Sequence, residues 1–86
     1  MNIEIAQARN LRIKSSVAVK GLGLDRATLR IVGDSIQAVV MPLSKYYKAD
    51  DDTIKRDFIR FVIGGIGNKL NDTVKEEIVK CLVKKL

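Results

Sequence analysis

The stretch from Leu24 to Lys48 has the pattern of a helix that is covered on most sides. Its polar residues fall on one narrow stripe at near-helical spacing: Arg26, Arg30, Asp34, Gln37, Ser44, Lys45 and Lys48. Most other positions are apolar, whereas a surface helix normally shows an apolar stripe on a polar cylinder. We therefore predict a long helix at about 25–48. Pro42 lies within it, and because the polar stripe resumes in phase after Pro42, we expect a kinked continuation rather than a break.

Residues 3–19 alternate between apolar and polar side chains. Six of the nine odd-numbered positions carry a large aliphatic residue, while no even-numbered position carries an apolar residue larger than alanine. A period of two in β-branched residues and leucine is typical of a strand with one buried face. If this segment were a helix, Asn10 would lie in the middle of its apolar stripe, and Ile5 and Leu11 would lie outside that stripe. We therefore predict an extended or β segment over residues 1–22.

Two further helices are predicted after an acidic loop. The first, at about 53–66, follows three adjacent aspartates, which suit the positive end of a helix macrodipole. Gly67 and its neighbouring glycines are expected to end it, and Gly65 to pack closely against a neighbour. The second helix, at about 73–86, begins at Thr73 and ends in lysines that a helix C-terminus favours.

These elements predict a single domain over residues 1–86, because a chain of this length has room for one core. The fold class is α+β and mainly helical, with a short N-terminal extended segment (1–22) followed by a helical core (24–86) of three helices. The alternative is a small all-α bundle.

The composition indicates more apolar surface than a chain of this length can bury. Hydrophobic residues make up 47% of the sequence, while a domain of this size buries only about 60–65% of the surface of its unfolded chain. Several apolar residues lie outside or widen the core stripes of the last two helices, and large exposed apolar patches mark interaction sites. We therefore predict a protein interface at Ile59, Ile63, Val79, Val83 and Leu86. It would serve a homo-oligomer or an accessory or assembly subunit that docks on a protein partner.

The net charge is +6, and a basic balance favours acidic partners such as nucleic acid. Two arginine pairs, each spaced by four residues, could contact phosphates without reading sequence. The alternative function is therefore sequence-independent nucleic-acid binding through Arg26, Arg30, Arg56 and Arg60. A different explanation is that these arginines lie on ordinary solvated helix faces. Arg30 would then pair with Asp34, and Arg56 or Arg60 with Asp57.

The sequence offers little for catalysis, so we expect a non-enzymatic protein without a cofactor, metal or evident small-molecule substrate. There is no histidine and only one cysteine, which excludes a Cys/His zinc site within one chain and a Ser-His-Asp triad. Cys81 is expected to be an inert core residue. Asp50, Asp51 and Asp52 lack the alternating ligands of a calcium loop. The glycines at 64–67 lack the strand-loop-helix context of a phosphate loop.

The sequence also predicts a location. No signal peptide is visible, and the longest uncharged stretch is the ten residues from Ser35 to Ser44, whereas a membrane span needs about twenty. A single cysteine fits a reducing compartment. We therefore expect a cytoplasmic protein with no membrane span.

Overall fold

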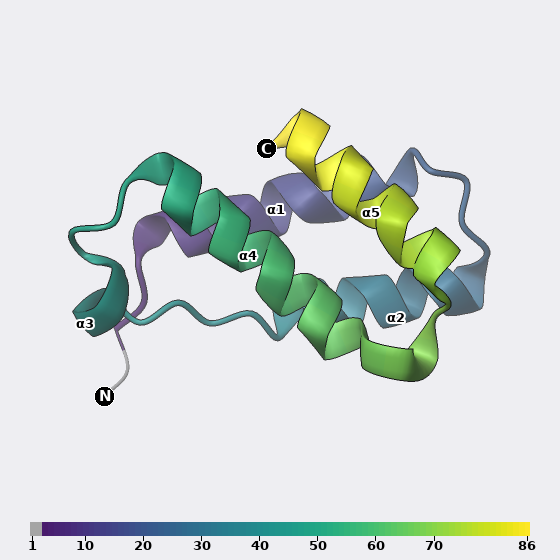
Figure 1. The fold of residues 1–86 in the computed structure, drawn as a ribbon, viewed down its shortest axis with the longest axis horizontal. Helices are drawn as coiled ribbons and strands as arrows, with labels where there is room; N and C mark the ends of the chain where they lie inside the picture. The colour runs from purple at the N-terminus through teal and green to yellow at the C-terminus, as the bar shows by residue number, and fades with distance from the viewer. Residues whose placement is uncertain (1–2) are drawn as a thin grey trace.

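The computed structural model describes residues 3–86 as a bundle of four long helices with a shorter helix at one end (Figure 1). In Figure 1, two of the long helices form the rear layer and two the front layer. The helical elements are α1 (Ala6–Lys20), α2 (Arg26–Gln37), α3 (Leu43–Tyr46), α4 (Asp51–Ile66), the 3-10 turn η1 (Gly67–Lys69) and α5 (Asp72–Lys85). The all-α alternative is therefore correct, and the α+β prediction with an N-terminal strand is wrong.

The predicted extended segment is instead the helix α1. Its buried stripe consists of Ala8, Leu11, Ser15 and Val19, spaced by three and four residues. Ile13 and Val17 point outward and are 59% and 67% exposed. The alternation was misleading because Ile13 and Val17 lie on the outer face of this helix, while the small residues Ala8 and Ser15 share the inner face with Leu11 and Val19. Residues 1 and 2 of the predicted segment lie outside the described residues.

A remnant of extended structure precedes α1. Ile5 N–H donates to the Met41 carbonyl at 3.0 Å, and Leu43 N–H donates to the Ile3 carbonyl at 2.8 Å. These bonds flank an isolated antiparallel bridge between Glu4 and Pro42. The pairing is too short to form a strand among residues 3–86, but it ties the start of the chain to the segment after α2.

The predicted long helix at 25–48 ends early, at Gln37. The chain then runs without regular structure to Pro42, after which the single turn of α3 begins. A proline disfavours the helical conformation in the residue before it, and Met41 is fully buried in the core. Pro42 therefore lies at the end of a non-helical segment and not at a kink within one helix. The polar residues after Pro42 keep the helical spacing only by coincidence.

Side-chain caps define where three helices begin. The side chain of Asp25 accepts from Thr28 N–H at 2.7 Å at the start of α2. Asp50 accepts from Thr53 N–H at 2.7 Å and Asn71 from Val74 N–H at 2.9 Å. The last two helices therefore start slightly earlier than the predicted 53 and 73, because these residues, and not Thr73, satisfy the free N–H groups.

The core is built around α4, which packs against α1, α2 and α5. Phe58, Val62 and Ile66 are completely buried on its inner face. Gly65 faces α2, and a Cβ atom there would make van der Waals contact with the Cβ of Ser35 at 3.5 Å. Gly67 ends α4 with a φ of 56°, a conformation that favours glycine.

Candidate functional site: a groove between α4 and α5

α4 and α5 lie side by side and antiparallel, joined by the turn at residues 67–71 (Figure 1). An apolar groove, lined by side chains of both helices, runs between them. Its volume is about 530 Å³, within the range of ligand-binding clefts. The lining consists of Asp52, Lys55, Arg56, Ile59, Arg60, Ile63, Val79, Leu82, Val83 and Leu86. All five residues predicted from the sequence as a protein interface are thus brought together in one place.

The spacing of the apolar residues produces the groove. On α4, Ile59 and Ile63 are four residues apart. On α5, Val79, Val83 and Leu86 are spaced by four and three. Residues at such spacings share one side of a helix. Each helix therefore contributes an aliphatic row, and the two rows form the walls of the groove.

The groove is deeper than the sequence indicates. Leu82 is fully buried and Ile59 is only 9% exposed, so these two residues form its floor. Ile59 is therefore largely covered by its own chain. Ile63, Val79 and Leu86 are half-buried, whereas Val83 is 67% exposed. The accessible apolar surface lies mainly on the α5 wall.

Basic side chains flank the groove on its α4 side. Lys55, Arg56 and Arg60 line it there, together with the carboxylate of Asp52. Arg60 is held only loosely, because its Nη1 lies 3.7 Å from Oδ1 of Asp57 and its side chain is 71% exposed. Neither Lys55 nor Arg56 forms an ion pair within 4.0 Å of a carboxylate in the described part of the chain. The groove thus combines an aliphatic floor with positive charge along one edge.

The four arginines of the alternative function are not gathered in the groove. Arg56 and Arg60 line it, but Arg26 and Arg30 are exposed on α2, in the rear layer of Figure 1. Between residues 3 and 86, Arg30 makes no ion pair with Asp34 within 4.0 Å. Of the ion pairs expected on ordinary solvated faces, the structure contains only the loose one between Arg60 and Asp57.

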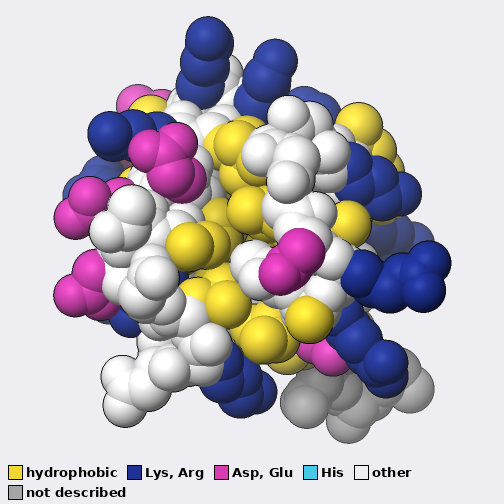
Figure 2. All heavy atoms as spheres, turned by 90° about the vertical axis from the view of Figure 1, so that its right-hand side faces the viewer, with side chains coloured by type: hydrophobic (Ala, Val, Ile, Leu, Met, Phe, Trp, Pro, Cys, Tyr) yellow, Lys and Arg dark blue, Asp and Glu magenta, His cyan; other side chains and the backbone are white. Residues whose placement is uncertain are grey.

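Other apolar surface lies outside the groove. Figure 2 shows the end of the bundle opposite α3, where hydrophobic side chains gather in the middle of the face and lysine and arginine stand around it. Backbone, polar and acidic groups interrupt this patch. Ile13 and Val17 form a smaller exposed pair on α1.

The remaining candidates have structural roles. Asp50 caps α4, with Asp51 and Asp52 in its first turn. No three acidic or cysteine side chains converge as a metal site within residues 3–86. Cys81 is half-buried, with its thiol donating to the Ala18 carbonyl at 3.6 Å. No helix of the described chain is long and apolar enough to cross a membrane.

Three groove residues were not predicted as site residues from the sequence: Asp52, Lys55 and Leu82. The signal for Lys55 is its position four residues before Ile59, which places both on the same side of α4. No protein family model, curated protein or solved structure matches the chain.

Proposed function

We propose that this protein is a non-enzymatic interaction module, an accessory or assembly subunit that docks protein surface into the groove between α4 and α5. The observation that carries this proposal is that Ile59, Ile63, Val79, Val83 and Leu86, from two helices, line one groove. Val83, 67% exposed on the α5 wall, is the residue a docked surface would cover most. The occupant would be a protein partner or a second copy of the chain.

The total exposed surface supports the proposal. The chain exposes 5859 Å², whereas a folded monomer of 9.6 kDa is expected to expose about 5,100 Å². Covering the groove is one way for such an elongated molecule, 36 × 26 × 20 Å, to reduce this excess.

The test is the mass of the protein in solution, measured by size-exclusion chromatography with light scattering. We expect a dimer or larger species, or a stable complex with a protein partner, at tens of micromolar. Ile63→Glu and Val83→Glu should reduce that mass. Ile59→Glu is less informative, because Ile59 is nearly buried and a charge there would also destabilise the fold.

The matched control is Val17→Glu on α1. Val17 and Val83 are equally exposed, but only Val83 lines the groove. The mass should therefore stay unchanged in the control. A monomer of the wild-type protein at tens of micromolar, with no partner found, would contradict the proposal.

The second candidate function is sequence-independent nucleic-acid binding. The observation that favours it is the cluster of Lys55, Arg56 and Arg60 on one edge of the groove, with Arg26 and Arg30 adding charge on α2. Binding to duplex or single-stranded DNA would weaken steeply as salt rises from about 50 to 200 mM. Absence of binding at the lower salt concentration would exclude this function.

A further inference from the structure

The spacing of the aliphatic residues along the groove suits a docked helix. The aliphatic rows repeat every three or four residues, which is the spacing at which the anchors of a docked helix interdigitate with its receptor. From Asp52 to Ile63 the α4 side runs for about 16 Å at the rise of an α-helix. A partner helix of about three turns, with apolar residues at every third or fourth position, would fill this length.

The charged residues of the groove indicate which kind of partner helix would bind. Its three cations, Lys55, Arg56 and Arg60, lie on α4, while the α5 wall is lined only by aliphatic side chains. A helix seated between them would therefore present one flank to positive charge and the other to apolar surface. Carboxylates on the flank that faces α4 would pair with the cations there. Arg60 is available to them, because its ion pair with Asp57 is loose.

The same charges disfavour a second copy as the occupant. Each copy carries a net charge of +6. If two copies docked groove to groove, the charged residues of both grooves, three cations and one carboxylate in each, would come together. Like charges across an interface suppress association, so an acidic partner fits this groove better than the chain itself does.

We propose that the groove binds an acidic amphipathic helix of a partner protein, with its apolar face on the aliphatic walls and its carboxylates against Lys55, Arg56 and Arg60. This inference rests on the proposed function and names the partner that it requires.

The test uses two synthetic helical peptides of about twelve residues, long enough for three turns. Both carry leucines at every third or fourth position; one has glutamates beside them and the other lysines. Fluorescence anisotropy should detect binding of the glutamate peptide about tenfold tighter than that of the lysine peptide, as expected when a few exposed charge pairs change sign. The preference should shrink at 1 M salt, where the Debye length falls to about 3 Å.

Variants of the chain locate the binding. Arg56→Glu combined with Arg60→Glu should reverse the peptide preference, whereas Arg30→Glu on α2 should leave it unchanged. Val83→Glu should abolish binding of the glutamate peptide, and Val17→Glu should not. Circular dichroism establishes that each variant is folded before binding is compared.

The outcomes separate this inference from the proposed function. Equal binding of both peptides in the groove would overturn the acidic partner but leave docking intact. Failure of both peptides together with a dimer that Val83→Glu disrupts would identify a second copy as the occupant and also overturn the inference. Failure of both peptides with a monomeric chain would contradict the inference and the proposed function together.

Discussion

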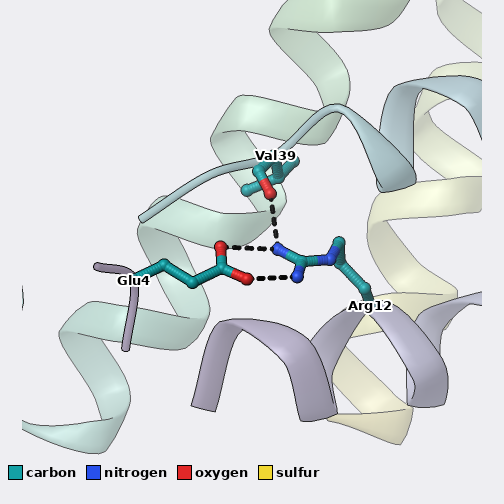
Figure 3. A network of polar contacts seen from close by, with 3 residues as sticks. All are labelled: Glu4, Arg12 and Val39. Atoms are coloured by element: carbon teal, nitrogen blue, oxygen red, sulfur yellow. Dashed lines mark hydrogen bonds and ion pairs between the residues drawn. The ribbon is translucent and has the colours of Figure 1, made fainter. Parts of the chain in front are cut away.

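Arg12 and Glu4 form a two-armed ion pair that fastens the start of the chain to α1 (Figure 3). Nη1 of Arg12 donates to Oε2 of Glu4 at 2.9 Å and to the Val39 carbonyl at 2.7 Å, while Nη2 reaches the other carboxylate oxygen. The two side chains are only 15% and 21% exposed. Because the cluster ties the start of the chain and α1 to the segment after α2, it contributes to the tertiary fold and is more than a surface pair.

Arg12→Ala should therefore lower the free energy of unfolding by about 2 kcal/mol, because it leaves a mostly buried carboxylate and a carbonyl without their donor. Urea unfolding measures this change. The control is Arg9→Ala on the same helix, where the exposed side chain should contribute less than about 0.5 kcal/mol. Equal losses in the two variants would show that the cluster has no special role.

The same ion pair predicts a pH dependence. The hydrogen bond from Arg12 lowers the pKa of Glu4 below its ordinary value of 4.5. A lowered pKa in the folded state means that the ionised carboxylate adds stability above pH 4.5, and that this contribution is lost as the pH falls through the folded value. The stability difference between wild type and Glu4→Gln should therefore be largest near neutral pH and shrink below pH 4.5. A difference that stays constant on acidification would contradict this assignment.

Two adjacent glycines in α4 should respond differently to substitution. A Cβ at Gly64 meets no atom within 4 Å, so Gly64→Ala should stabilise the helix by about 0.5–1 kcal/mol. A leucine should also be tolerated there. Gly65→Leu should instead destabilise by about 1–3 kcal/mol, because the longer side chain would push α4 away from Ser35 on α2. Thermal unfolding of both leucine variants compares the two positions, and equal stabilities would argue against close packing of α2 on α4.

α3 is anchored through one tyrosine of a pair. The hydroxyl of Tyr46 donates to Oδ2 of Asp57 at 2.9 Å, and the Tyr46 ring is 4% exposed, whereas Tyr47 is 64% exposed. Tyr46→Phe should cost about 1 kcal/mol in urea unfolding through the lost hydrogen bond. Tyr47→Phe should leave the stability unchanged. The prediction fails if the two substitutions have the same effect.

The sequence predicted the last two helices well because their signals are local. The three aspartates ahead of α4 and the lysines at the end of α5 act through helix ends that need no tertiary partner. The five apolar residues that meet in the groove were singled out for a similar reason, since the apolar faces of α4 and α5 follow directly from spacing. The depth of the groove was not predictable, because the burial of Ile59 depends on how closely α5 packs beside α4.

The first half of the chain was misread because tertiary packing outweighs local pattern there. The inner face of α1 combines Leu11 and Val19 with the small residues Ala8 and Ser15, while Ile13 and Val17 are exposed, so large aliphatic residues alone do not mark the buried side. The end of α2 is set by contacts between distant segments, among them the burial of Met41 and the Arg12–Val39 hydrogen bond. Propensity and periodicity within one segment carry no information about such partners.

The most direct test of the docking groove is an NMR titration of the isotope-labelled chain, in which methyl resonances are followed as protein concentration rises and as the glutamate peptide is added. We predict that the methyl signals of Ile63, Val79 and Val83 shift in at least one of the two series, while those of Ile13 and Val17, exposed on α1, stay in place. Shifts confined to α1, or no shifts at the groove in either series, would contradict the account.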